Sequence, residues 1–541
     1  MKPLEVTVRM RDGVDIALAL YKPAGEGPFP VLLGASPYRY DNNALPASPQ
    51  FLWRETGPVD FYVERGYVYA SMDARGCGKS GGEFRFLHPD EQQDLREVIQ
   101  WLGAQPWSNG SVGGIGQSFF CMYQWWMGIL KPPALKCLGA FDGLADPYRA
   151  SVYQGGILGD FFGSYWWNQN RLINRNPANG EHPREQAYDL NLEIQRHPLY
   201  DEFWRSRSAA ERLHEIEVPL YSVGIWGKVD LHTRGNIDGF RRAKGPKKLR
   251  MNGPVNAFAA NREFNSPQMH EKLLLPFYER YLKGVKTDYD ERPPVEYFVR
   301  GADAYRSCET WPPPGARPTT WFLSPERSRS VTSLNDGSLT PKNSSENSTT
   351  YSYPDPGWLM GVVGLGPNLQ PDPARRVLTW TTAPLEKDLE IAGPVKLTLF
   401  ASSTGRDTDF FVKLSEQLPQ SPEERAKDLN PPYFWITKGW LRASHRALDP
   451  AKSTEMEPCH PHTQAEPIER GKVYRFDISL EPIAHRFRKG SRVRLELANG
   501  DSAVTDMLWT HYYNPHKIGA DTIHHSSAHP SALVLPVTEG A

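Results

Sequence analysis

The sequence lacks the features that would place it in several common protein classes. No apolar stretch approaches the roughly 20 residues of a membrane-spanning helix. Cysteine is scarce, and an odd number without a C-x-x-C pair argues against a disulfide framework or a structural zinc site. The five cysteines are Cys77, Cys121, Cys137, Cys308 and Cys459. Charge is balanced, with 62 Lys and Arg against 63 Asp and Glu, so nothing favours nucleic-acid binding.

An export signal is also missing, since MKPLEVTVRMRDG has neither an apolar core nor a cleavage pattern. We therefore expect a cytoplasmic protein without membrane partners. At 541 residues, with 39% hydrophobic and 23% charged residues, the chain should form two or three globular domains. No motif calls for a metal or an organic cofactor, so we expect none. The sequence leaves open whether the chain forms a homo-oligomer.

The first half alternates short apolar runs with helical patterns, which is typical of an α/β sheet. A hairpin is predicted to turn at Asp12-Gly13. Leu95, Val98, Ile99 and Leu102 recur at helical spacing and predict an amphipathic crossover helix. The predicted elements are the hairpin Val6–Pro23, strands at Phe29–Tyr38, Tyr67–Gly76 and Ser111–Gly116, and helices at Asp90–Gln105, after Ser118 and at His270–Gly284.

Composition changes along the chain predict four segments. Residues 1–147 and 218–290 form the two parts of an α/β domain. Residues 148–217, irregular and rich in aromatics, form a helical insertion that covers the open end of the sheet. Residues 291–541 carry short alternating strands separated by turn residues, which predicts an all-β sandwich of jelly-roll type.

A candidate nucleophile stands in GGIGQSFFC, Gly113–Cys121. Small residues between a strand and a helix permit a strained turn that projects a serine hydroxyl above the sheet, and Ser118 is so placed. The N–H of Phe119, at the positive end of the helix, would then stabilise an oxyanion. The alternative is a buried serine that caps the helix.

Two further residues fit the same reaction centre. Tyr38, in the loop SPYRY after an earlier strand, offers a second oxyanion donor, although it could be an ordinary half-buried tyrosine. Asp230 follows a later strand, in the order serine, acid, histidine of α/β hydrolases. Asp230 could instead cap the following helix.

Several motifs resemble those of one known family. They are Pro37-Tyr38, DARGCGKSGG from Asp73 to Gly82, Gly116–Cys121, Trp226–Gly235, and the C-terminal stretches IAGPVKLTLFASSTGRDTDFFVKL, TKGWLRASHR and EPIAHRFRKGSRVRLEL. The chain resembles the family of cocaine esterases, X-Pro dipeptidyl-peptidases and α-amino acid ester hydrolases over nearly its whole length. The resemblance implies an α/β-hydrolase domain with an inserted helical cap and a C-terminal jelly roll. It also implies Ser118 as nucleophile, Tyr38 as oxyanion donor and Asp230 as acid.

The histidine of the family is not where the resemblance places it. After Gly253-Pro254 its register falls on Asn256 or Ala257, and neither can accept a proton. Loss of a triad histidine typically costs on the order of 10⁶ in turnover. Three explanations remain: an engineered variant, recruitment of another histidine such as His232 or His270, or a scaffold reassigned to chemistry without an acyl-enzyme.

Aromatic residues predict a pocket for a flat, apolar substrate. Its candidate lining is Tyr165, Trp166, Trp167 and Trp226, whereas Trp125 and Trp126 are expected in the core. The sequence thus predicts a serine-dependent hydrolase or acyl-transfer scaffold for an ester or amide of a small molecule, with its usual base absent. One alternative is non-hydrolytic elimination, isomerisation or cyclisation of a carbonyl compound. The other is a non-catalytic binding protein.

Overall fold

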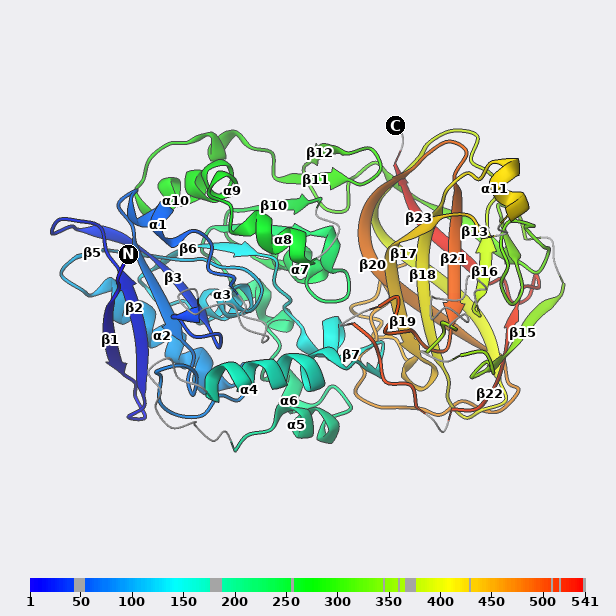
Figure 1. The fold of residues 1–541 in the computed structure, drawn as a ribbon, viewed down its shortest axis with the longest axis horizontal. Helices are drawn as coiled ribbons and strands as arrows, with labels where there is room; N and C mark the ends of the chain where they lie inside the picture. Colours follow the sequence, from blue (N-terminus) through cyan, green and yellow to red (C-terminus); the bar gives the residue numbers. More distant parts are fainter. Residues whose placement is uncertain are drawn as a thin grey trace.

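The computed structural model divides into an α/β half and an all-β half that lie side by side (Figure 1). It describes residues 1–42, 54–175, 187–253, 257–343, 346–358, 361–364, 376–427, 430–506, 509–514 and 517–538. The predicted fold class, an α/β-hydrolase domain joined to a C-terminal β domain, is confirmed.

A ten-stranded sheet forms the centre of the α/β half. Its order is β1 (Leu4–Arg9), β2 (Asp15–Tyr21), β4 (Val68–Asp73), β3 (Phe29–Ser36), β5 (Ser108–Gly114), β6 (Leu135–Phe141), β9 (Leu220–Ile225), β10 (Lys247–Asn252), β11 (Val295–Val299) and β12 (Ala304–Cys308). The strands from β4 to β11 pair in parallel, and the remaining pairs are antiparallel. Strands β4 and β9 are buried along their whole length, as expected for central parallel strands covered on both faces.

Helices cover both faces of this sheet. Side chains of α2 (Pro89–Gly103) and α3 (Phe119–Leu130) pack in one core cluster, and α7 (Thr233–Arg242) contacts β9 and β10. Side chains of α1 (Val59–Val63), α8 (Ala257–Phe264), α9 (Pro267–Lys272) and α10 (Leu274–Leu282) pack in a second cluster. The single helix predicted at His270–Gly284 is thus two helices that meet at Leu273.

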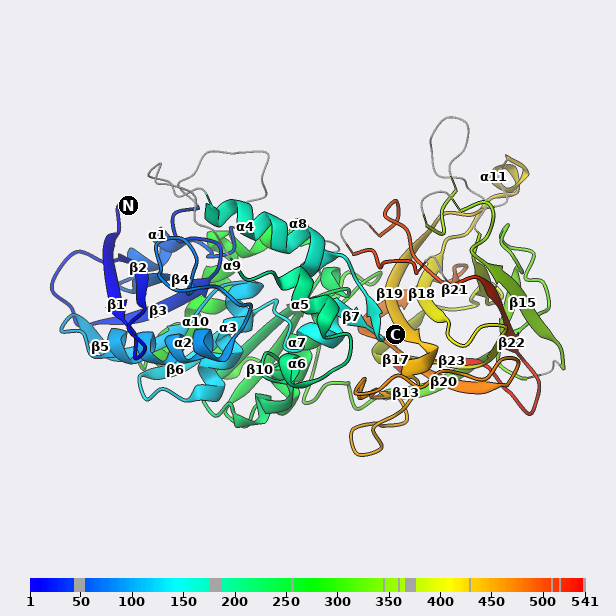
Figure 2. The same cartoon turned by 90° about the horizontal axis from the view of Figure 1, so that it is seen from below.

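The insertion between β6 and β9 is irregular. It begins with two π-helical turns, Tyr148–Val152 and Phe161–Trp166, and a small hairpin of β7 (Tyr153–Gln154) and β8 (Ile157–Leu158). It continues with α4 (Trp167–Arg175), α5 (Leu190–Arg196) and α6 (Glu202–Arg205), followed by a 3-10 turn at Ala210–Glu215. Figures 1 and 2 show α4, α5 and α6 gathered beside the α/β sheet.

The all-β half is one eleven-stranded sheet that curls back on itself, because β17 pairs with both β20 and β23. Its order is β15 (Ser348–Tyr353), β22 (Gly519–His524), β17 (Leu389–Ser403), β20 (Tyr474–Phe487), β19 (Tyr433–Arg442), β18 (Asp409–Gln417), β21 (Arg492–Ala498), β16 (Leu378–Thr381), β14 (Gly337–Thr340), β13 (Ala316–Ser324) and β23 (Ala532–Thr538). A short helix, α11 (Pro422–Lys427), lies between β18 and β19.

The all-β sheet begins later than residue 291, where the sequence predicts its start. β11 pairs in parallel with β10, with Val295 opposite Leu249, and β12 pairs with β11. These two strands extend the α/β sheet, and the first strand of the all-β sheet is β13.

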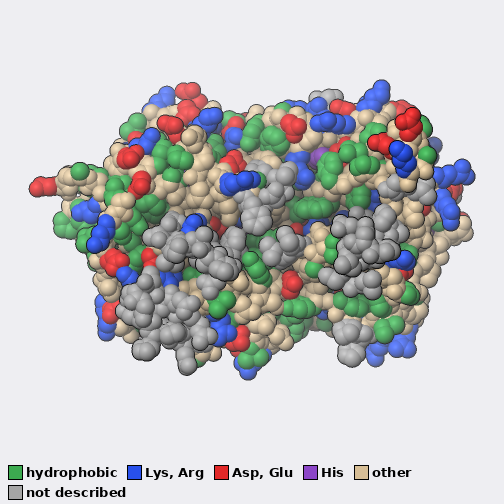
Figure 3. Space-filling model, viewed as in Figure 1, with side chains coloured by type: hydrophobic (Ala, Val, Ile, Leu, Met, Phe, Trp, Pro, Cys, Tyr) green, Lys and Arg blue, Asp and Glu red, His purple; other side chains and the backbone are tan. Residues whose placement is uncertain are grey.

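Acidic and basic side chains are interspersed on the face seen in Figure 3.

Among the residues that the structure describes, no helix is both long and apolar enough to cross a membrane.

Candidate active site

The candidate site lies where parallel strands end. Ser118 follows β5 and Tyr38 follows β3, while Asp142 and His232 follow β6 and β9. The carboxyl ends of neighbouring parallel strands share one edge, where open α/β sheets bind their ligands.

Ser118 sits on a strained turn. Its φ of 61° and ψ of −115° lie outside the regions that ordinary residues adopt. Its N–H donates to the carbonyl of Asp142 at 2.9 Å, which fixes the turn against the end of β6. Gly116 is required because a Cβ there would lie 2.4 Å from the Cβ of Phe120. This is the predicted elbow, and Ser118 is only 8% exposed.

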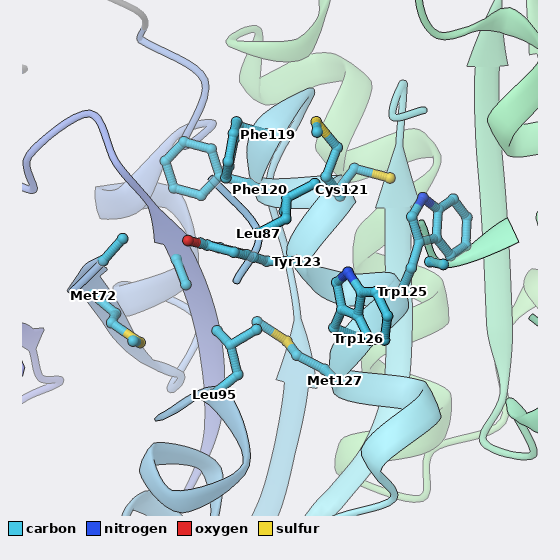
Figure 4. Packing of buried hydrophobic residues seen from close by; sticks show 14 of the residues in the cluster. Met72, Leu87, Leu95, Phe119, Phe120, Cys121, Tyr123, Trp125, Trp126 and Met127 are labelled. Atoms are coloured by element: carbon cyan, nitrogen blue, oxygen red, sulfur yellow. The ribbon is translucent and has the colours of Figure 1, made fainter. Parts of the chain in front are cut away.

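Helix α3 holds this turn through its buried side chains. All its residues from Phe119 to Ile129 are buried. Figure 4 shows Phe119, Phe120 and Cys121 at the start of the helix and Trp125 and Trp126 further along it. The two tryptophans belong to the core, as expected. Phe119 begins the helix directly after Ser118, so its N–H lies at the positive end of α3.

Tyr38 lies beside this helix end and is buried. Its ring meets that of Phe119 edge to face, with centroids 5.9 Å apart. Its hydroxyl accepts a hydrogen bond from Nε1 of Trp166 at 2.9 Å. Asn174, on α4, donates to the carbonyl of Pro37 at 2.9 Å. The insertion thus fixes both the loop and the phenol.

A histidine contacts the Ser118 hydroxyl: Nε2 of His232 lies 2.9 Å from Oγ of Ser118. The Nδ1 atom accepts a hydrogen bond from the N–H of Leu144 at 3.0 Å. Burial and the nearby charge of Lys228 hold the pKa of His232 well below its ordinary value, so the ring is neutral. A neutral imidazole carries one N–H, and an accepting Nδ1 places it on Nε2. His232 therefore donates to Ser118.

Asp230 does not fill the predicted role of orienting acid. Its carboxylate bonds Nζ of Lys438 at 2.9 Å, and Lys438 also bonds Asp506 at 2.8 Å. Lys438 belongs to β19 of the all-β half. The ring of His232 is held by the N–H of Leu144, not by this carboxylate. The physical reason is that the buried Lys438 forms an ion pair with Asp230, and this pair joins the all-β half to the α/β half.

The predicted vacant base position lies outside what the structure describes. Asn256 is not among the described residues. Helix α8 begins at Ala257, whose side chain is likewise outside the described part. His270, the other histidine considered for recruitment, is buried on the opposite face of the sheet, where Nδ1 lies 2.7 Å from the hydroxyl of Tyr62.

Glu55 is a functional candidate that the sequence does not reveal. Its side chain is 1% exposed, and its carbonyl accepts from the N–H of Gln117 at 3.0 Å. Its Oε2 atom is buried and has no hydrogen-bond partner among the residues that the structure describes. Burial raises the pKa of Glu55 to about 8.

A buried ion pair lies behind Glu55. Nζ of Lys228 is 2.6 Å from Oδ2 of Asp142, and both side chains are almost fully buried. Gln117 donates to the same Oδ2 at 2.9 Å. Burial has the largest effect on the pKa of Glu55 and raises it. The charge of Lys228 lowers this pKa by less, and the charge of Asp142 raises it further. This pair is also absent from the sequence-based predictions, since a lone Lys and a lone Asp carry no recognisable pattern.

The four aromatic residues predicted to line the pocket do not lie together. Trp166 reaches the site, where its ring stacks on that of Phe119 at 5.5 Å. Trp167 packs on Phe84, and Tyr165 lies beside Phe161 on the insertion. Trp226 does not line the site. It is buried in the second domain's core cluster and donates through Nε1 to the carbonyl of Phe298 at 2.7 Å.

A separate cleft opens between the insertion and the all-β half, and Ser118 is not among its lining residues. Two of the arginines that line it form ion pairs, Arg149 with Asp146 at 2.7 Å and Arg241 with Glu457 at 2.8 Å. Within the described ranges, no group of three His, Cys, Asp or Glu side chains could hold a metal ion.

Comparisons with known proteins agree with this architecture. Residues 12–254 match the family model of the X-Pro dipeptidyl-peptidase (S15 family), and residues 287–534 match the X-Pro dipeptidyl-peptidase C-terminal non-catalytic domain. The cocaine esterase of Rhodococcus sp. is 26% identical over 603 residues, covering 98% of both chains. A CocE/NonD family hydrolase from Staphylococcus aureus superposes with a TM-score of 0.81 at 26% identity, covering 99% of this chain and 93% of that one.

An α-amino acid ester hydrolase shares the fold, with a TM-score of 0.76 at 20% identity over 99% of this chain and 96% of that one. The two family models together span most of the sequence, in the order that the two halves of the structure follow. The chain therefore belongs to the family of X-Pro dipeptidyl-peptidases and cocaine esterases, which are serine hydrolases of the α/β-hydrolase fold.

Proposed function

We propose that this chain hydrolyses an ester or amide of a small molecule through an acyl-enzyme on Ser118. The observation that carries the proposal is the strained turn that points the Ser118 hydroxyl at an imidazole 2.9 Å away, next to the N–H of Phe119. A turn with these dihedral angles costs on the order of 1–3 kcal/mol. Such strain at a polar group on the ligand-binding edge of the sheet supports a catalytic role for the hydroxyl.

Each side chain has a distinct task in this reaction. Ser118 attacks the carbonyl carbon, and the N–H of Phe119 and the hydroxyl of Tyr38 stabilise the oxyanion that forms. Because the Tyr38 oxygen already accepts from Trp166, its hydrogen serves as the donor. The aromatic rings of Trp166 and Phe119 favour an apolar acyl or leaving group.

The experiment is to treat the protein with a fluorophosphonate and locate the adduct by mass spectrometry, with aryl esters of increasing size as substrates. An adduct on Ser118 and ester cleavage that Ser118→Ala abolishes are the expected results. Thr56→Ser, which alters a nearby hydroxyl residue whose side chain bonds the main chain, is a matched control. Ester cleavage that persists unchanged in Ser118→Ala would remove the acyl-enzyme from the mechanism.

A second candidate function is proton-transfer chemistry without an acyl-enzyme, such as an elimination, isomerisation or cyclisation. One observation favours it: Glu55 is almost completely buried, and its main-chain carbonyl accepts from the N–H of Gln117, the residue before Ser118. A carboxyl with a pKa near the working pH is suited to moving protons. Turnover of an enolisable ketone by Ser118→Ala would favour this candidate.

A further inference from the structure

One loop of the all-β half packs against the insertion of the α/β half. This loop, residues 509–512 (the strap), lies between β21 and β22. The N–H of Asp160 donates to the carbonyl of Thr510 at 2.9 Å, and the N–H of Tyr512 donates to the carbonyl of Leu158 at 2.9 Å. The two segments form an antiparallel bridge. Figures 1 and 2 show β7, which pairs with β8 in the insertion, at the junction of the two halves. The strap therefore joins the halves through main-chain hydrogen bonds.

A row of aromatic rings leads from the strap to Tyr38. The ring centroids of Trp509 and Phe161 lie 4.2 Å apart. Phe161 begins the π-helical turn that ends at Trp166, and the ring of Phe162 lies 5.3 Å from each of these two rings. Trp166 in turn donates to the Tyr38 hydroxyl at 2.9 Å. Because close-packed interiors transmit strain, a shift of Trp509 should reach the phenol.

Buried ion pairs hold the strap on the side of the all-β half. Asp506 bonds Nζ of Lys438 at 2.8 Å, and its main-chain carbonyl accepts from the N–H of Trp509 at 2.9 Å. Asp501 accepts from the N–H of His511 at 3.1 Å, and its carboxylate lies 2.8 Å from Nδ1 of the same histidine. Both carboxylates and the side chains they bond are buried. The strap is therefore fixed by the all-β half on one side and presents Trp509 to the insertion on the other.

We infer that Trp509 is a positioning residue for Tyr38, so that the all-β half takes part in catalysis through the insertion. The inference rests on the proposed function, because Tyr38 affects the rate only where an oxyanion forms beside it. Trp509 acts through Phe161 and Trp166, the two ends of one turn. This turn is π-helical, a rare conformation that is frequent at functional sites.

The precision that an oxyanion donor needs explains why a distant ring matters. Such a donor works when it lies about 2.7–3.1 Å from the charge that forms in the transition state. A misplacement of about 1 Å, even one caused far from the chemistry, can cost about 10² in rate. The Tyr38 hydroxyl is held by Nε1 of Trp166, so its position depends on where the π-helical turn lies. Loss of the Trp509 ring should therefore lower the rate without removing the donor.

The test is a double-mutant cycle between Trp509 and Tyr38, measured as steady-state cleavage of an aryl ester. Trp509→Ala should lower kcat by roughly 2- to 10-fold and change KM little, because the donor acts on the transition state. In the Tyr38→Phe chain the same substitution should lower kcat by less than about twofold, since the donor that Trp509 positions is gone. Trp509→Phe keeps a ring on Phe161 and should restore most of the rate.

Trp321→Ala is the matched control. Trp321 and Trp509 are both partly buried, but Trp321 lies on β13, where it pairs with Leu533 of β23. Its replacement should leave kcat unchanged. A thermal melt checks that each variant folds, and Trp509→Leu replaces Trp509→Ala if the alanine variant does not.

Two outcomes would overturn the inference. One is a folded Trp509→Ala whose kcat equals that of the unmodified protein. The other is a loss of the same size with and without the Tyr38 hydroxyl, which would give Trp509 a purely structural role. Failure of the proposed function is distinguishable from both, because Ser118 would then take up no fluorophosphonate and Ser118→Ala would leave ester cleavage unchanged.

Discussion

His232 contacts Ser118 in the reverse sense to a catalytic triad. Nε2 of His232 lies 2.9 Å from Oγ of Ser118, and its Nδ1 accepts from the N–H of Leu144 at 3.0 Å. In a triad a carboxylate at Nδ1 holds the tautomer that accepts the serine proton and stabilises the imidazolium. A main-chain N–H at that position selects the opposite tautomer and repels the imidazolium. The contact between serine and histidine is therefore kept while its chemistry is changed.

The first prediction concerns Asp230. Because its carboxylate bonds Lys438 and not His232, Asp230→Asn should change the rate of Ser118 modification by less than about threefold. Removal of a true triad acid costs about 10⁴ in turnover. Stability should fall instead, because Lys438 loses one of its two buried anionic partners. Labelling kinetics and a thermal melt measure the two effects separately. A labelling rate that drops 10³-fold in a folded variant would restore Asp230 to the catalytic centre.

The second prediction concerns the phenol of Tyr38. Tyr38→Phe removes one oxyanion donor, and loss of such a donor typically lowers kcat by about 10² to 10³. KM should change little, because the donor acts on charge that forms only in the transition state. Steady-state cleavage of an aryl ester separates these parameters. Trp166→Phe is the control, since it removes the N–H that donates to Tyr38 and keeps an aromatic ring beside Phe119, so its effect should be below about tenfold.

The sequence predicts the scaffold better than the proton transfers within it. Ser118 and Tyr38 are predictable because an elbow and a strand end have local patterns, and the structure brings both to one edge of the sheet. The positions of Asp230 and Glu55 depend on partners far along the chain: Lys438 is 208 residues from Asp230, and Gln117, which bonds the Glu55 carbonyl, is more than sixty residues from Glu55. No local pattern encodes such pairings. The prediction that Trp226 lines the pocket is wrong for the same reason, since Trp226 packs on Trp311 within a core cluster that the sequence does not reveal.

The third prediction is a stability effect of Glu55 that depends on pH. Its pKa is about 8 in the folded state and about 4.3 in an unfolded chain, so the folded state binds this proton more tightly. The resulting stability is fully present below about pH 4.3 and is lost as the pH rises to 8. At about 1.4 kcal/mol per pKa unit, the loss amounts to a few kcal/mol.

Glu55→Gln should therefore melt at a higher temperature than the unmodified protein, by a margin that grows between pH 5 and 8 and is constant above. Calorimetry across this range measures the margin. Other buried acids such as Asp73 and Glu91 are present in both proteins and cancel in the difference. Glu26→Gln, at an exposed position, should show no such trend. A margin that shrinks as the pH rises would contradict the assignment of a raised pKa.

The fourth prediction separates the structural from the electrostatic role of the Lys228–Asp142 pair. Lys228→Met leaves Asp142 buried without its cation, which should cost about 3–5 kcal/mol. Asp142→Asn in the same chain removes the stranded charge and should recover most of that loss, which a double-mutant cycle quantifies. The recovered double variant then reports on Glu55. Since Lys228 affects the pKa of Glu55 more than Asp142 does, removing both should raise that pKa, so the stability margin of Glu55→Gln should keep growing above pH 8. A margin that still levels off at pH 8 in the stable double variant would mean that the group that titrates is not the Glu55 carboxyl.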